Sequence, residues 1–144
     1  MSIEAHIVTP DADAAAAWYA RAFGAAEVSR VPLPGGRTMA VAMQVCGDTF
    51  HIASEFPDWG IVSPGTIGGT ATVLQLNTGD ALGLWGRAIT AGAAVRHPLG
   101  DTFWGELHGQ LTDPFGHRWN VAQKVRDVPP AEIAAAAAQA FGGQ

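Results

Sequence analysis

The chain carries the same series of secondary-structure signals twice, and this internal repeat constrains its fold more than any other feature. In the first half, an alternating strand over residues 3–9 precedes residues 12–23, where apolar side chains recur at the spacing of one helix face. The second half repeats this order, with a strand over residues 70–77 and a helix that Asp80 can cap. Each helix stops at a glycine, and strand-like segments follow. Each half is therefore predicted to fold as strand–helix–strand–strand–strand.

The remaining strands and the boundaries follow from the same patterns. Further strands are expected at residues 26–31, 37–45 and 48–55 in the first half and at residues 94–97, 105–112 and 117–123 in the second. Residues 1–59 are assigned to module one, 60–69 to a glycine-rich linker, 70–124 to module two and 125–144 to a helical tail. Since Ile133, Ala137 and Phe141 align on one face of that tail, we expect it to pack.

The last two strands are joined by a strong turn signal. Residues 113–116, Asp-Pro-Phe-Gly, place Asp first, Pro second and Gly fourth, which are the preferences of a type I turn. Residues with strand character lie on both sides, at 107–112 and 117–121. A four-residue loop between two such segments predicts a β-hairpin.

The sequence around this turn resembles the closing hairpin of the glyoxalase / bleomycin-resistance / extradiol-dioxygenase proteins, the vicinal oxygen chelate (VOC) superfamily. Residues 101–120 read DTFWGELHGQLTDPFGHRWN. FWG before the turn and HRW after it are similar to the PhnB-like branch. DADAAAAWYARAFGA, at residues 11–25, also resembles the first helix of that family. The resemblance implies an α+β fold in which residues 1–124 form two βαβββ modules. Their eight strands would form a cupped mixed sheet around a ligand, with a C-terminal helix following.

Composition excludes several classes of protein. A length of 144 residues with 48% hydrophobic and 15% charged content describes one packed domain. The net charge of −5 argues against a nucleic-acid partner, and no apolar stretch reaches the roughly 18 residues of a membrane span. The N-terminus lacks a signal-peptide pattern, so a cytoplasmic location is expected. Cys46, the single cysteine, lies in an apolar strand pattern and is predicted to be a buried small side chain rather than a nucleophile.

Strand alternation indicates which side chains face the cup. His51, Gln75, Arg118 and Asn120 each alternate with apolar neighbours that should pack against the helices, so these four are predicted to line the ligand site. Three small residues on the same side leave space for a ligand: Ala40, Ala42 and Ala53. Thr38 is expected on the Ala40 side as well.

Two tryptophans outside the predicted core, Trp59 and Trp104, are further candidates. Both stand in loop or strand-start positions beside a phenylalanine, where an aromatic ring can stack on a flat ligand. The alternative is that they cap the core or a subunit contact. Both interpretations stay open from the sequence.

The resemblance also implies four positions at which metal-dependent members carry His or Glu. The first falls at Glu4, with His6 on the same face, and the second near His51. The other two fall at Val73, followed by Gln75, and at Asn120, none of which is a good ligand. We therefore predict no metal and no cofactor. The alternative is one divalent ion held by Glu4, His6 and His51.

These observations lead to one principal functional hypothesis and two alternatives. The principal one is metal-free binding of a small, mostly apolar and planar organic molecule, as in resistance or sequestration. The first alternative is a metal-dependent glyoxalase-like lyase, isomerase or dioxygenase, and the second is a purely structural dimer module. Whether the protein is an enzyme stays open. The resemblance implies a homodimer, because the cup of this family is often completed between subunits.

Overall fold

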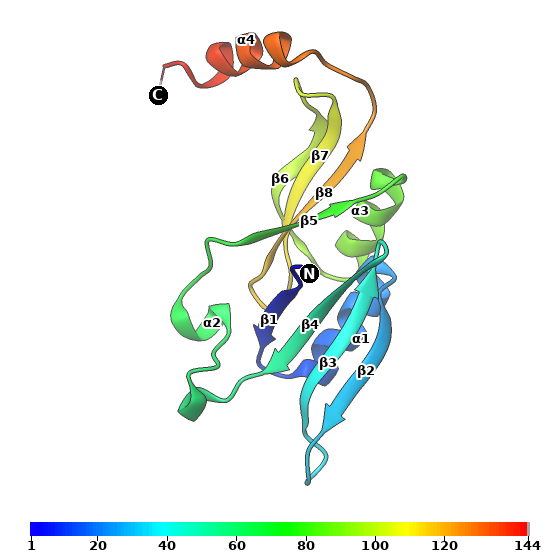
Figure 1. Cartoon of the computed structure of the whole chain (residues 1–144), viewed down its shortest axis with the longest axis vertical. Helices are drawn as coiled ribbons and strands as arrows, with labels where there is room; N and C mark the ends of the chain where they lie inside the picture. The colour runs from blue at the N-terminus through cyan, green and yellow to red at the C-terminus, as the bar shows by residue number, and fades with distance from the viewer. Residues whose placement is uncertain (144) are drawn as a thin grey trace.

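The computed structural model describes residues 1–143 and confirms the repeated order of elements (Figure 1). The first repeat consists of β1 (Ala5–Thr9), α1 (Ala12–Phe23), β2 (Ala26–Pro32), β3 (Thr38–Val45) and β4 (Asp48–Ser54). The second consists of β5 (Val73–Asn77), α3 (Ala81–Thr90), β6 (Ala94–Asp101), β7 (Glu106–Thr112) and β8 (Arg118–Lys124). A short 3₁₀ turn η1 (Pro57–Trp59) and a one-turn helix α2 (Pro64–Ile67) lie between the repeats, and α4 (Pro130–Phe141) follows them.

The eight strands form two four-stranded mixed sheets, ordered β1-β4-β3-β2 and β5-β8-β7-β6. In each sheet the first strand of the repeat pairs in parallel with the last, and the other pairs are antiparallel. This is the βαβββ arrangement expected for each module. The parallel pair brings residues from the two ends of a module side by side.

The two long helices form where the sequence supplies caps. The Asp11 side chain accepts a hydrogen bond from the amide of Asp13, and Asp80 accepts one from Gly83, so each helix begins at a capped N-terminus. Helix α1 ends at Gly24, whose φ of 69° favours glycine. The helices pack against each other, and the indole of Trp18 donates to the Ala91 carbonyl across their contact at 2.7 Å.

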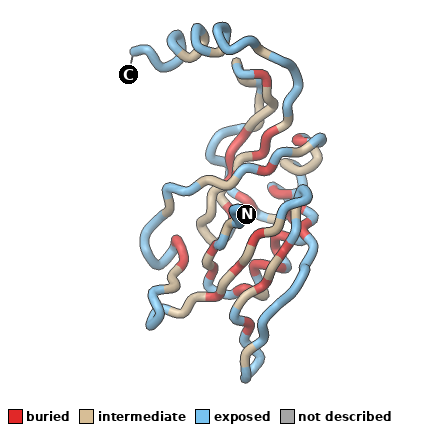
Figure 2. The backbone as a smooth tube through the Cα atoms, viewed as in Figure 1, coloured by how far each residue is buried: buried red, intermediate tan, exposed pale blue. Residues whose placement is uncertain are grey.

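An aromatic cluster forms the centre of the core. Tyr19 and Phe23 of α1 pack against Phe50 of the first sheet and Trp119 of the second, with ring centroids 4.9–5.7 Å apart. All four side chains are buried. Figure 2 shows buried segments in both sheets and in α1. Buried residues alternate with more exposed ones along β3, β4 and the first half of β8, so one face of each sheet points inward. The opposite faces of the sheets are left for other contacts.

The Asp113 turn joins the two modules. One carboxylate oxygen of Asp113 accepts the backbone amides of Phe115 and His117 at 2.8 and 3.0 Å, which closes the turn. The other oxygen accepts the hydroxyl of Tyr19 from α1 and the indole of Trp119. The His117 imidazole in turn bonds the Val8 carbonyl of β1 at 2.7 Å. The hairpin that carries the family resemblance is therefore a structural joint, with its polar groups facing the core.

The expectation for Cys46 was wrong. Cys46 is exposed and adopts φ of 51° in the two-residue turn between β3 and β4, followed by Gly47 at φ of 82°. Two positive φ values are typical of the tight hairpin turn that matches the twist of its strands. Partial burial and the carboxylate of Asp48 raise the pKa of the Cys46 thiol, which disfavours a thiolate nucleophile.

One face assignment in β3 was also wrong. Thr38 was expected on the same side as Ala40, but it is 3% exposed and donates to the Asp13 carboxylate on the helix side. The pairing of β2 with β3 slips between Val31 and Pro32, which leaves Met39 as an extra residue. This bulge reverses the alternation at the start of the strand.

The tail helix α4 stands away from both sheets (Figure 1). It buries none of its residues, and the Phe141 ring lies 6.5 Å from Phe103, between centroids. Within residues 1–143 the tail helix therefore makes only limited contact with the rest of its own chain, and its packing against a second subunit stays a prediction. In residues 1–143 no helix has the length and apolar character needed to cross a membrane.

Candidate functional site

The second sheet carries a continuous row of polar side chains on the face that its helix leaves uncovered. Gln75 and Asn77 come from β5, Asn120 from β8 and Gln110 from β7, and we call these four residues the amide row. Asn120 lies directly opposite both Gln75 and Gln110 in the strand register. Because paired residues point to the same side of a sheet, their amide groups meet.

Hydrogen bonds connect every member of this row. The Gln110 amide nitrogen donates to the Asn120 oxygen at 2.9 Å, and the Asn120 nitrogen donates to Gln75 at 3.4 Å. The Gln75 nitrogen then donates to the Asn77 oxygen at 2.9 Å. The row extends across three strands, from a buried Gln110 to an exposed Asn77 at the sheet edge.

Arg118 stands at the Gln110 end of the row. Its Nε and Nη2 donate to the Gln110 Oε1 at 3.1 and 2.9 Å, and its Nη1 contacts the Thr70 carbonyl at 3.4 Å. Of the five N–H donors of a guanidinium, two have no partner in residues 1–143. No Asp or Glu of that part of the chain pairs with Arg118. Neutral groups therefore hold the Arg118 side chain in place, and no carboxylate within residues 1–143 neutralises its charge. An anionic group of a ligand can pair with it.

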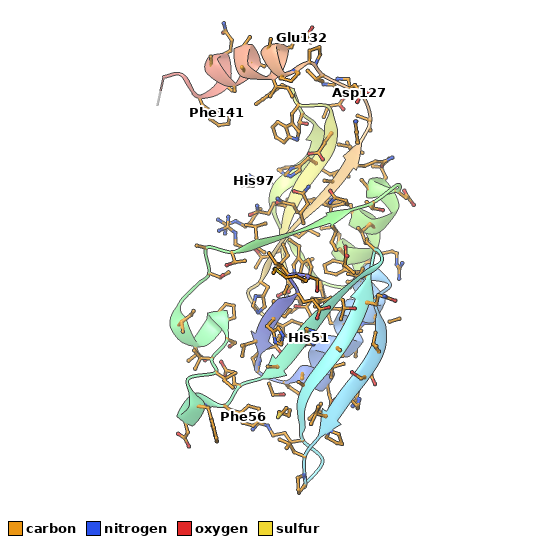
Figure 3. The ribbon with its side chains drawn as sticks, viewed as in Figure 1. His51, Phe56, His97, Asp127, Glu132 and Phe141 are labelled. Carbon is orange, nitrogen blue, oxygen red and sulfur yellow. The ribbon has the colours of Figure 1, made fainter. Side chains whose placement is uncertain are left out.

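A second polar cluster lies on the first sheet, where β1 and β4 pair in parallel. His6 and His51 are opposite each other in register, with their rings stacked at 4.3 Å and 18°. The His51 Nε2 lies 2.8 Å from the Glu4 Oε1. His51 lies toward the centre of the molecule in Figure 3. The three residues predicted as the alternative metal ligands are thus neighbours.

The geometry of this cluster does not fit a metal site. Ligands of one ion direct their donor atoms at a common point, whereas stacked imidazoles lie in nearly parallel planes. Over residues 1–143, no group of three or more His, Cys, Asp or Glu side chains is arranged to hold an ion. The prediction of a metal-free protein itself stays a prediction.

The two polar clusters border a common groove of about 190 Å³ between the modules. His6 lines it from the first sheet and Arg118 from the second, while Pro64 and Ile67 of α2 form part of its wall. The linker therefore contributes to this groove. A separate crevice of about 330 Å³ is lined by Gln75 and Asn77 at the other end of the amide row, together with apolar residues of both modules.

The two candidate tryptophans lie outside the row. Trp104 precedes β7, where its indole donates to the Glu106 carboxylate and its ring lies 5.5 Å from that of His108. Trp59 is 83% exposed in η1, next to Phe56 at the outer end of the first module (Figure 3). The structure thus brings together three of the six predicted residues, namely Gln75, Arg118 and Asn120. His51, Trp59 and Trp104 are elsewhere.

Sequence reasoning missed Gln110 as a site residue. Counting outward from the Asp113 turn places Gln110 opposite Asn120 in a regular hairpin. The hairpin register could therefore have identified Gln110 as a neighbour of Asn120. What the sequence could not show was that Arg118 turns toward Gln110.

Solved structures with the same fold include several proteins of low sequence identity. TioX from Micromonospora sp. ML1 covers 86% of this chain and 100% of its own, with 22% identity and a TM-score of 0.69. The PhnB protein of Bacillus cereus covers 85% and 99%, with 16% identity and a TM-score of 0.59. A glyoxalase/bleomycin resistance protein/dioxygenase family enzyme from Burkholderia phytofirmans PsJN covers 85% and 97%, with 17% identity and a TM-score of 0.66. These similarities show the fold.

Sequence comparison gives the family. Uncharacterized proteins of Mycobacterium bovis and Mycobacterium tuberculosis are 36% identical over 138 residues, which is 94% of this chain and 91% and 81% of theirs. The model of the Glyoxalase/Bleomycin resistance protein/Dioxygenase superfamily matches residues 3–121, almost all of the two modules. The chain belongs to this superfamily.

Proposed function

We propose that the protein binds a small organic molecule on the uncovered face of the second sheet, without a metal ion. The observation that carries this proposal is that Arg118 has only neutral hydrogen-bond partners, and no acidic one, within residues 1–143. A half-buried guanidinium without an acidic partner costs solvation energy, and a ligand with an anionic or carbonyl group offsets that cost. The groove beside Arg118 supplies a concave, partly apolar surface for the rest of the molecule.

The metal-dependent alternative has less support from the geometry. A lyase, isomerase or dioxygenase of that kind needs an ion as Lewis acid, and the stacked His6 and His51 do not converge on one point. A resistance or sequestration role needs binding alone. Binding by preformed side chains is therefore the function that this arrangement favours.

We also propose that the working form is a homodimer. In one chain the row at Arg118 and the His51 cluster lie on different sheets, and the amide row is exposed at Asn77. The apolar side of α4, with Ile133 and Phe141, contacts little of its own chain. A two-fold partner would cover these surfaces and enclose the ligand.

Titration of tryptophan fluorescence against a panel of aromatic carboxylic acids, the amides of these acids, and aromatic ketones tests the binding proposal. We expect at least one acid or ketone to bind, and Arg118→Ala to weaken that binding by about tenfold, which corresponds to ~1.4 kcal/mol. Arg96→Ala is the matched control, because it removes the same charge from an exposed position on β6. Equal affinities for wild type and Arg118→Ala would exclude this face as the site.

A further inference from the structure

The segment that links the two modules is tied to the rest of the chain by few polar contacts. Residues 57–69 contain η1 and α2 and belong to neither sheet (Figure 1). Their backbone hydrogen bonds close local turns among residues 56–69. Within residues 1–143, the hydrogen bonds from this segment to the chain outside residues 56–69 all end on one atom, the Oε1 of Glu55. Since residues 65–69 are exposed, the placement of α2 depends largely on that carboxylate.

Glu55 can hold the segment because its own backbone is anchored to the first sheet. It directly follows β4, and its carbonyl accepts a hydrogen bond from the Arg37 guanidinium at 2.7 Å. Its Oε1 accepts the backbone amide of Ser63 and the hydroxyl of Thr66, each at 2.6 Å, and also the hydroxyl of Ser63. The bonds from Ser63 and Thr66 favour the charged carboxylate and lower the pKa of Glu55. One side chain of the first module thus fixes α2.

The same segment forms one wall of the groove beside Arg118. Three of its side chains line this wall: Val62, Pro64 and Ile67. The other lining residues belong to β1, β5 and β8 or stand just before the last two strands. A strand cannot move without breaking the hydrogen bonds to its neighbours, whereas the segment has glycines in the left-handed region near both ends, Gly60 with φ of 73° and Gly68 with φ of 95°. The segment is therefore the wall that can yield.

The size of the groove gives this wall a role in selecting the ligand. A protein cavity of about 150 Å³ holds benzene, so the groove of about 190 Å³ has room for one aromatic ring and little more. A second ring can enter only if a wall moves aside. We infer that Glu55, by holding residues 57–69 in place, limits the groove to ligands with a single aromatic ring. This inference rests on the proposed function and specifies the size of its ligand.

Benzoate and 2-naphthoate test this limit by calorimetry, because they share a carboxylate and differ by one ring. In wild type we expect 2-naphthoate to bind no more tightly than benzoate, since its second ring stays outside the groove. In Glu55→Ala the ratio of the two affinities should shift about tenfold toward 2-naphthoate, which corresponds to ~1.4 kcal/mol. The double variant Ser63→Ala, Thr66→Ala removes two of the three bonds from the other side of the contact and should shift the ratio in the same direction.

Asp58→Ala is the matched control for Glu55→Ala. Asp58 is an exposed carboxylate of the same segment and forms no ion pair within residues 1–143. Its removal takes away the same charge and should leave the ratio of affinities unchanged. Glu55→Gln keeps an acceptor oxygen without the charge and should give an intermediate ratio. If Glu55→Ala weakens both acids by the same factor, Glu55 has only a structural role and the inference is wrong.

A measurement without ligand tests the Glu55 contact itself. Amide hydrogen exchange over residues 63–69 should become about tenfold faster in Glu55→Ala, while exchange in β4 and β8 stays unchanged. Unchanged exchange over residues 63–69 would refute the inference. If neither acid binds to wild type or to Glu55→Ala at millimolar concentration, the proposed function fails and the inference with it. If both acids bind and Glu55→Ala leaves their ratio unchanged, only the inference fails.

Discussion

Replacing Asp113 with asparagine tests the joint between the modules. The carboxylate of Asp113 is 4% exposed and accepts four hydrogen bonds, two from the backbone and two from Tyr19 and Trp119. An asparagine oxygen would keep the two backbone bonds, so its NH₂ would face the other two groups. The tyrosine hydroxyl can turn to accept, but the indole N–H has no acceptor and loses its partner.

The expected loss follows from these contacts. An unsatisfied buried donor costs about 1–3 kcal/mol, and exchanging charged for neutral acceptors weakens the remaining bonds, so we expect Asp113→Asn to lose about 2–4 kcal/mol. With a urea dependence of about 1–3 kcal/mol per molar for small proteins, the unfolding midpoint should fall by about 1–2 M. Tyr19→Phe should be milder, because it removes one donor and leaves three bonds in place.

Urea unfolding monitored by circular dichroism and tryptophan fluorescence measures these changes. Asp127→Asn is the control, because Asp127 is a surface carboxylate whose ion pair within residues 1–143 is with Lys124 alone, so its loss should leave the urea midpoint nearly unchanged. If Asp113→Asn destabilises the protein no more than Asp127→Asn does, the joint does not stabilise the fold. The double variant with Tyr19→Phe should be less than additive, since both changes affect one network.

Four further outcomes are expected. Burial and the Asp113 carboxylate raise the pKa of Tyr19 well above 10.0, so its contribution to stability is complete below pH 10 and is lost as the pH rises further; Tyr19→Phe should flatten this dependence in urea titrations. Gly109→Ala should lower the unfolding free energy by about 1–3 kcal/mol, since a Cβ there would lie 2.6 Å from the Trp85 ring. Sedimentation should show a dimer at micromolar concentration, and Phe141→Asp should weaken it. Elemental analysis of protein purified without chelator should find little divalent metal; about one ion per chain, lost in His51→Ala, would favour the enzyme alternative.

Local signals in the sequence predicted most of the fold. The helix caps, the turn at residues 113–116 and the apolar periodicities involve neighbours in the chain, and each appears where it was expected. The errors occurred where one residue changes the register. Cys46 belongs to a two-residue turn and Met39 to a bulge, and neither change alters the average pattern around it.

The candidate site was predicted only in part, for a related reason. Alternation placed Gln75, Arg118 and Asn120 on one face, because the side-chain period of a strand is a local property. It could not show that Trp59 lies beside Phe56 in η1, away from these three residues, since loop positions depend on packing. Nor could it order the strands within each sheet.

The sequence by itself determined the two modules, their helices and the turn at residues 113–116, since these depend on contacts between residues close in the chain. Only the tertiary structure decided that Asp113 bonds Tyr19 across 94 positions, and that Gln75 of β5 meets Asn120 of β8 across 45. The parallel pairing of β5 with β8 joins strands that are distant in sequence, and the packing of α1 against the second sheet joins the modules. Such contacts form because apolar faces are buried together, and the polar groups on the remaining faces meet as a result.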